Sequence, residues 1–248
     1  LGFKSTTTAT LDGFSPRHAS LLSDEGLEVM SGLFYVMEII GLPPSQLWYL
    51  MMPLLEKPTG GFRAVLSQPG FMRIWEATKD EHQRNFARAN ARPYWGIEAG
   101  KSCEGIVFLQ AARMEAAASA NASGISPLVA TSVQLDGRKY YEQFDHDKLF
   151  DRYLAIGGDK PTAKVLGNYW KAARFVKIAN HHGTKAIFAT RGMPAGTKFC
   201  RSMLIAYAQE AFDKFIDKCP NVDFTSFVDD EFIGCYALRW KVADMTEF

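Results

Sequence analysis

Helical and strand periodicities alternate along the first half of the chain. The predicted helices span residues 20–40, 74–92 and 102–120. Ser23 is a candidate cap of the first helix, and Gly41-Leu42-Pro43-Pro44 ends it. Two apolar runs, 51–55 and 62–66, flank the turn Lys57-Pro58-Thr59-Gly60-Gly61, so they predict a hairpin with a basic tip.

The second half mixes strands with helices. Residues 128–135 form a short apolar run with Val and Thr, which predicts a buried strand ending just before Asp136. The other predicted elements are helices over 147–155, 162–178 and 198–218 and strands over 186–190, 222–228 and 231–240. The last two strands meet at Asp229-Asp230. This order of elements predicts an α+β fold.

Length and composition allow one large domain or two small ones. The chain has 248 residues, of which 47% are hydrophobic, enough to bury a sizeable core. Its formal net charge is only +1, so it lacks the basic excess that often accompanies binding to nucleic acid. The apolar stretch over residues 32–41 is broken by Glu38 and is too short to span a bilayer, so no membrane partner is expected.

The cysteines indicate the compartment. Cys103, Cys200, Cys219 and Cys235 have neither zinc-site spacing nor the pattern of a disulfide framework. Scattered thiols are typical of a reducing intracellular compartment, nuclear or cytoplasmic. Residue 1 is Leu and no basic-then-apolar leader follows, so we expect the chain to begin inside a longer reading frame.

Adjacent aspartates at a hairpin tip give the first chemical signal. Asp229 and Asp230 repel one another, and acidic residues are poor strand formers. Mg²⁺ prefers carboxylate oxygens, and two such ions about 4 Å apart can hold the attacking and leaving oxygens of a phosphoryl transfer. Asp136, at the end of its own strand, is the natural third carboxylate. A lone Asp-Asp pair is more often a solvated turn, so its neighbours decide.

Five short motifs follow one another along nearly the whole chain. They are Leu11-Asp12-Gly13, residues 53–63 with Arg73-Ile74-Trp75, the segment from Asp136 to Leu149, Arg191-Gly192-Met193-Pro194-Ala195-Gly196, and Phe227-Val228-Asp229-Asp230. In this order they resemble the motifs of reverse transcriptases of the non-LTR retrotransposon and group II intron type. The final motif resembles the family's aromatic-x-Asp-Asp signature. Any one motif is weak evidence, whereas five in order are strong.

The third motif matches the family position by position. Asp136 is followed five residues later by the aromatic Tyr141, then by the acid Glu142, and later by His146 and Leu149. The resemblance implies fingers over residues 1–95, including the basic hairpin at about 51–67. It also implies a palm over residues 96–248, with a small antiparallel sheet packed on helices and the thumb absent.

The resemblance implies an RNA-directed DNA polymerase whose partners are an RNA template, a DNA primer and dNTPs. Asp136 and Asp229 would bind two Mg²⁺ ions, with Mn²⁺ as a possible substitute, and Asp230 would support them. Tyr141 falls on the sugar-gate position, where an aromatic ring excludes a ribose 2′-hydroxyl. Lys57 and Arg63 would contact the incoming triphosphate.

The turn motif would lie against the nucleotide and the template base pair. Its residues on this account are Gly192, Pro194, Ala195 and Gly196, with the two glycines allowing close approach of the backbone. Simpler roles stay open for other residues: Tyr141 as a core aromatic, and Lys57 and Arg63 as solvated charges. We interpret His146 as a helix-start or packing residue and His181-His182 as loop.

The chain departs from the family pattern in and around the motifs. Ala195 stands where the family usually has Gln, Glu142 replaces a more common Asp, and Phe144 replaces a smaller aliphatic residue. Ala195, together with the end of the chain about eighteen residues after Asp230, keeps a second hypothesis open, a decayed or repurposed palm that binds nucleic acid without catalysis. A third, an RNA-templated RNA polymerase, is disfavoured by Tyr141, since such enzymes must admit the 2′-hydroxyl.

Overall fold

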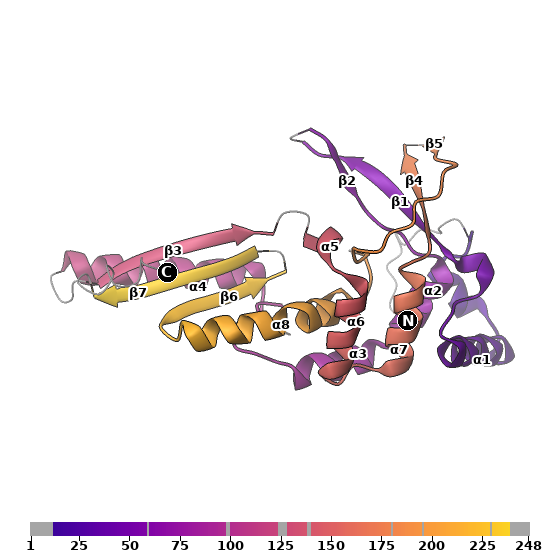
Figure 1. Cartoon of the computed structure of the whole chain (residues 1–248), viewed down its shortest axis with the longest axis horizontal. Coiled ribbons are helices and arrows are strands. Elements are labelled where there is room, and N and C mark those ends of the chain that lie inside the picture. The colour runs from indigo at the N-terminus through magenta and orange to yellow at the C-terminus, as the bar shows by residue number, and fades with distance from the viewer. Residues whose placement is uncertain are drawn as a thin grey trace. The chain divides into compact units, whose positions relative to one another are not determined.

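The computed structural model describes residues 12–58, 60–97, 100–123, 128–137, 140–179, 181–194, 196–228 and 230–238 (Figure 1). The chain divides into two compact units. Unit 1 contains the described parts of Leu1–Ala89 and Tyr141–Tyr207, and unit 2 those of Asn90–Tyr140 and Ala208–Phe248. These units differ from the fingers and palm expected on either side of residue 95, and that subdivision stays a prediction.

Unit 1 contains a four-stranded sheet in the order β2-β1-β4-β5. Its strands are β1 (Tyr49–Glu56), β2 (Phe62–Ala64), β4 (Ala173–Ile178) and β5 (His181–His182). β1 and β2 form the expected hairpin, in which Glu56 lies opposite Phe62. Gly60 and Gly61 both have positive φ, a conformation that glycine adopts without steric penalty, so the predicted turn is confirmed. β4 lies parallel to β1 on its other side.

Unit 1 also contains several helices. They are α1 (Asp24–Ile40), α2 (Gly70–Thr78), α3 (Asp80–Ala89), α6 (His146–Ala155) and α7 (Lys160–Tyr169), with the short helices η1 (Pro16–Leu21), η2 (Ser45–Leu47) and α5 (Tyr140–Gln143). The Ser23 hydroxyl accepts a hydrogen bond from the Gly26 amide, as predicted for the cap of α1. Asp145 and Asp159 cap α6 and α7 in the same way.

The core of unit 1 is dominated by aromatic side chains. Its fully buried members include Trp75, Phe144, Tyr153, Tyr169, Trp170 and Phe199. Trp75 of α2 packs against Phe199, with ring centroids 5.8 Å apart. This core therefore connects α2 to the chain that follows the Arg191–Gly196 turn.

Unit 2 is built around a three-stranded antiparallel sheet in the order β3-β7-β6. The strands are β3 (Leu128–Asp136), β7 (Asp230–Leu238) and β6 (Val222–Phe227), and the long helices are α4 (Cys103–Ala122) and α8 (Cys200–Lys218), of which unit 2 holds the second part. The predicted strands at Asp136 and on both sides of Asp229 are confirmed.

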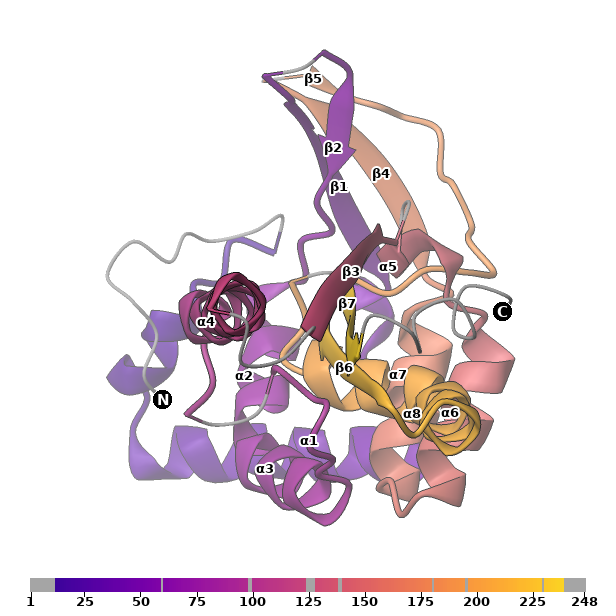
Figure 2. The same cartoon turned by 90° about the vertical axis from the view of Figure 1, so that its left-hand side faces the viewer.

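The two helices cover opposite faces of this sheet (Figure 2). Phe212 and Phe215 of α8 pack on Phe224 of β6, at 4.8 and 5.4 Å between ring centroids. On α4, Arg113 forms an ion pair with Asp223, which directly precedes Phe224 in the same strand. Because successive side chains of a strand point to opposite faces, α8 and α4 lie on different sides.

Three predicted elements are wrong. The helix expected over 74–92 is two helices, α2 and α3, with a break at Lys79. The helix expected over 162–178 ends at Tyr169, because residues 173–178 pair with β1, and this distant pairing overrides local helix propensity. The expected strand at 186–190 is absent from the described residues, where Ile187 makes only an isolated bridge to Arg174.

His181-His182, which we expected to be loop, forms the short strand β5. Among the described helices, none combines the length and apolar character needed to cross a membrane.

Candidate functional site

Asp136 and Asp230 lie directly opposite one another on neighbouring strands of unit 2. Phe227 lies opposite Asp230 on its other side, so the three residues form one row across the sheet. Directly opposite side chains share a face, with Cβ atoms about 4.5–5.5 Å apart, and like charges in this position destabilise a sheet. Both carboxylates are exposed. A divalent cation between them would remove the repulsion.

This pair is part of the predicted metal site. Among the described residues, no three His, Cys, Asp or Glu side chains gather in a group that could hold an ion. The third predicted ligand, Asp229, lies outside the described residues. Two carboxylates on one face suit a hard cation that keeps its other positions for water or phosphate, so the donor set fits Mg²⁺.

The β6–β7 connection is strained beside Asp229. Only Val228 and Asp229 separate the two strands, which defines a two-residue hairpin. Val228 has a φ of 63°, and a β-branched residue in this left-handed region is a genuine outlier. Such a conformation costs about 1–3 kcal/mol and is typical of functional sites.

We expect Val228→Gly to change the stability of the chain by less than about 1 kcal/mol, because relief of left-handed strain offsets the added backbone entropy. Thr225→Gly, in the middle of the same strand, lacks this compensation and should destabilise by at least about 1 kcal/mol. Urea unfolding of both variants tests this. Equal losses would show that Val228 is not strained.

The face that carries the carboxylates also carries α4. Asp136, Asp230 and Phe227 have the same orientation as Asp223 two rows away, which pairs with Arg113 of α4. A small cavity of about 50 Å³ separates the first turns of α4, at Cys103 and Ile106, from Asp230 and Phe227. The carboxylate face is therefore partly covered by the first turns of α4.

In unit 1 the structure brings Tyr141 next to the Arg191–Gly196 turn. The Met193 amide donates to the carbonyl of Tyr141 at 2.7 Å, and the Gly192 amide donates to the carbonyl of Phe144 at 2.8 Å. Tyr141 is half-buried, and its ring lies edge-on to Phe144 with centroids 6.4 Å apart. The predicted gate and turn are thus held together by their backbones.

The two glycines of the turn differ in their roles. Gly192 has a φ of 90°, and a Cβ there would lie 3.2 Å from the Glu142 Cα, so only glycine fits. Gly196 has no positive φ, and a Cβ there would make ordinary contact with the Leu66 carbonyl at 3.4 Å. Of these two glycines, only Gly192 is required by its own backbone, and close approach of the turn to a template stays a prediction. Pro194 is buried, and Ala195 lies outside the described residues.

Two buried side chains converge on the Gly192 carbonyl. Nε2 of His146 lies 2.8 Å from this oxygen, and the guanidinium of Arg174 donates to it at 3.4 Å. His146 starts α6 and is only 1% exposed, which confirms the interpretation as a helix-start and packing residue. Burial, together with the charges of Arg174 and Lys171, lowers the pKa of His146. A neutral imidazole protonated on Nε2 satisfies the contact.

This pKa shift predicts a pH dependence. Because the pKa of folded His146 lies below its ordinary value of 6.5, the unfolded chain takes up the proton more readily, and stability falls as the pH drops below that value. His146→Gln keeps an amide donor near Gly192 but does not titrate. The difference in urea midpoint between wild type and this variant should therefore change from pH 7.5 to pH 5.5. A constant difference would contradict the shift.

Glu76 fixes the other end of the turn. One of its oxygens accepts hydrogen bonds from the Thr197 hydroxyl at 2.6 Å and the Gln68 amide at 2.8 Å, and the other accepts from the Lys198 amide at 2.9 Å. The side chain is 1% exposed, and burial raises its pKa. Sequence reasoning missed Glu76 and Arg174. The only sequence signal for a buried charge was the position of each residue next to two apolar residues, Ile74-Trp75 for Glu76 and Phe175-Val176 for Arg174.

Lys57 and Arg63 lie on the β1–β2 hairpin, and both side chains are exposed. The Lys57 carbonyl and amide close the turn through bonds with Gly60 and Gly61. The exposure of Lys57 and Arg63 leaves both charges available to bind phosphate. Exposure alone does not distinguish phosphate binding from the role of solvated charges on the hairpin.

Comparison with known proteins rests on the fold. No family model matches the chain, and no curated protein matches it. Among solved structures, it is similar to an apo telomerase from Candida tropicalis truncated from its C-terminal domain, with a TM-score of 0.51 and 13% sequence identity. The match covers 82% of this chain and 46% of that one, so the chain spans less than half of the telomerase chain. The chain therefore has a mixed α+β fold like that of this telomerase.

Proposed function

We propose that this chain catalyses template-directed nucleotidyl transfer, adding dNTPs to a primer 3′-hydroxyl on an RNA template. The observation that carries the proposal is the direct pairing of Asp136 with Asp230 beside the strained tip that contains Asp229. The likeness in fold to a telomerase supports it, as does the order of the five motifs. In finer terms, we propose an enzyme of the retrotransposon or intron type, with fingers and palm.

In this proposal Asp136 and Asp229 hold two Mg²⁺ ions and Asp230 supports them. Held by these residues, such ions would supply neutralisation of the charge that develops on the attacking and leaving oxygens. The chain itself supplies positioning and fixed charge, without a covalent nucleophile. Lys57 and Arg63 bind the triphosphate as charge-assisted donors.

The remaining residues orient the nucleotide. Tyr141 follows Asp136 by five residues, so the chain keeps it within about 18 Å. Its ring occupies the space that a 2′-hydroxyl would need. The turn of Gly192, Pro194, Ala195 and Gly196 supports the base pair, and its backbone is fixed by His146 and Glu76 at its two ends.

Primer extension tests the proposal. The protein, expressed from its complete reading frame, is given an RNA template, a DNA primer, dNTPs and Mg²⁺ or Mn²⁺. We expect extension by the wild type and none by Asp229→Asn. Equal extension by both proteins, or none by either, would overturn it.

Tyr141→Ala should admit ribonucleotides. Without the ring, the 2′-hydroxyl meets no steric barrier, so incorporation of rNTPs relative to dNTPs should rise by about tenfold or more, equivalent to about 1.4 kcal/mol. Single-turnover incorporation on one template measures the ratio. Tyr140→Ala is a matched control, since the neighbouring tyrosine has no role in the proposed gate. Unchanged discrimination in Tyr141→Ala would make the residue a core aromatic.

A second candidate is binding of nucleic acid without catalysis. The position of α4 on the carboxylate face favours it, as does Ala195 in place of the family's Gln. Titration with Mn²⁺ separates the two functions. A protein that binds nucleic acid without catalysis need not bind Mn²⁺. In such a protein, Asp136→Asn would leave the affinity for nucleic acid unchanged.

A further inference from the structure

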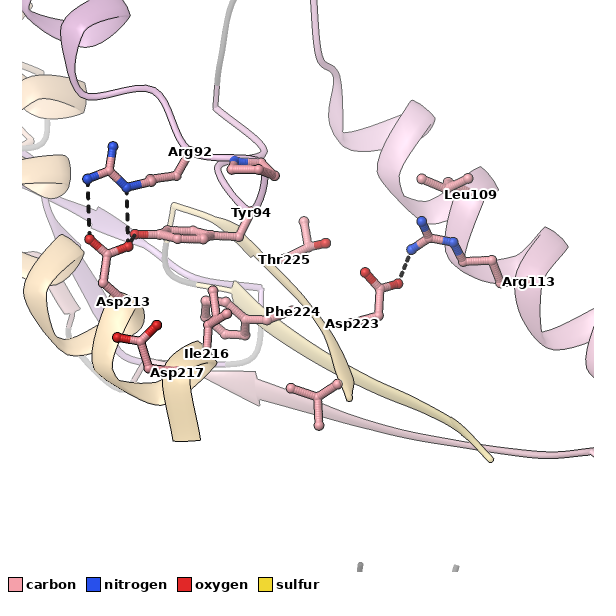
Figure 3. A pocket seen from close by; sticks show the side chains of 12 residues that line it. Arg92, Tyr94, Leu109, Arg113, Asp213, Ile216, Asp217, Asp223, Phe224 and Thr225 are labelled. Carbon is pink, nitrogen blue, oxygen red and sulfur yellow. Dashed lines mark hydrogen bonds and ion pairs between the residues drawn. The ribbon is translucent and has the colours of Figure 1, made fainter. Parts of the chain in front are cut away.

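A groove runs along the outer edge of β6, away from the carboxylates. Its volume is about 680 Å³, and the four consecutive strand residues 222–225 line it. α4 contributes Leu109 and Arg113 to one wall, and α8 contributes Ile216 and Asp217 to the other (Figure 3). Cavities that hold ligands commonly have about 300–1,000 Å³. The groove is thus large enough for several residues of an extended chain.

The backbone of β6 points into this groove. The Ser226 amide donates to the Tyr94 carbonyl at 2.9 Å, and the Gly96 amide donates to the Ser226 carbonyl at 2.8 Å, so both groups of Ser226 face away from β7. Outward-facing residues alternate along an antiparallel strand, so Phe224 directs its amide and carbonyl the same way. Within the described part of the chain, neither group has a hydrogen bond on this outer side.

The segment Tyr94–Gly96 already pairs with this edge of β6, at the end of the strand that contains Ser226. Trp95 forms a parallel bridge with Ser226, and Tyr94 closes the groove at that end. Two residues earlier in β6, the backbone edge at Phe224 is not paired with another strand of the described chain. An unpaired strand edge is a ready template for pairing with another chain.

The charged side chains that line the groove indicate which kind of ligand it could bind. Asp213 is held by Arg92 and by the Tyr94 hydroxyl, which donates at 2.7 Å, and Asp223 is paired with Arg113. Asp217, one turn after Asp213 on α8, is exposed, and no ion pair to it is seen among the described residues. Three carboxylates against two guanidinium groups leave the groove one negative charge in excess, on the wall formed by α8.

We propose that this groove binds an extended peptide segment of a partner protein as a strand added to β6. Main-chain bonds to Phe224 would hold the segment, and alternate side chains would select it. Those facing α8 would be Lys or Arg, opposite Asp217. Those facing α4 would be apolar, against Leu109, which is 49% exposed. The proposal is independent of nucleotide transfer.

The probe is a fluorescein-labelled peptide with the sequence acetyl-Val-Lys-Val-Lys-Val-amide, titrated into the full chain and followed by anisotropy. We expect saturable binding and amide shifts in NMR spectra clustered at residues 222–225. Only every second peptide residue bonds to β6, so N-methylation of one alternate set should weaken binding about tenfold or more and the other set less than twofold.

Matched variants test the charge selection. Asp217→Asn should weaken binding of the lysine peptide about three- to fivefold, as expected for an exposed ion pair, while Glu28→Gln on α1 should have no effect. A peptide with Glu for Lys should bind the wild type more weakly than Asp217→Asn.

Three outcomes would overturn the proposal. They are the absence of saturable binding, equal sensitivity to both N-methylated sets, and shifts that fall outside the groove. Self-association that the peptide displaces would assign the edge to a second copy of this chain instead, and would likewise overturn the assignment.

Discussion

Asp136→Asn is expected to abolish nucleotide addition while leaving the fold as stable as before or slightly more stable. The substitution removes a proposed metal ligand, and loss of several kcal/mol of charge stabilisation corresponds to at least about a thousandfold in rate. It also removes one of two like charges that face each other across β3 and β7. A residue kept for structure alone would not show these opposite effects.

Two assays on the same preparations make this measurement: single-turnover extension with saturating Mg²⁺, and urea unfolding without metal. Asp217→Asn provides a matched control, since it neutralises an exposed aspartate elsewhere in unit 2. It should leave the rate within about twofold of wild type, well inside a 1.4 kcal/mol change. If Asp136→Asn kept the rate within tenfold, this carboxylate would not be a ligand of the catalytic ions.

Glu76→Leu should lower the free energy of unfolding by about 3–5 kcal/mol, the largest stability effect we expect. The change leaves the Gln68 amide, the Thr197 hydroxyl and the Lys198 amide without their acceptor, at about 1–3 kcal/mol for each buried donor. Because Glu76 connects α2 to the chain after the turn, nucleotide affinity should fall as well.

Glu76→Gln provides the matched control. It keeps the shape and one acceptor oxygen, so it should lose less than half as much stability. Burial raises the pKa of Glu76, so the folded chain binds this proton more readily than the unfolded chain, and the wild type loses stability as the pH rises above 4.5. The variant lacks that loss. If urea unfolding showed the same small loss of stability for Glu76→Leu and Glu76→Gln, the hydrogen-bond network would not stabilise the fold.

Local signals predicted much of the fold. The Ser23 cap, the glycine-rich β1–β2 turn and the strand ending at Asp136 are each encoded within a few neighbouring residues. The prediction of a helix was wrong for residues 173–178, because their strand conformation depends on pairing with β1, more than a hundred residues earlier in the chain. Periodicity carries no information about such a pairing.

The candidate site shows the same division. The sequence identified the carboxylates, but the position of Asp230 directly opposite Asp136 follows from the register of two strands far apart in the chain. The contacts that support the turn were not predicted for the same reason, since Glu76, His146 and Arg174 reach it from three separate elements. The presence of α4 on the carboxylate face could not be deduced either, since the apolar residues in the sequence of this helix mark no single face.

Template-dependent incorporation of a single nucleotide tests the central claim most directly. Four RNA templates that differ only in the first unpaired base are each annealed to one DNA primer and offered each dNTP with Mg²⁺. The proposed function predicts addition of the complementary dNTP alone on each template, and no addition when Asp229 is replaced by Asn. Addition that ignores the template base, or that survives in Asp229→Asn, would contradict it.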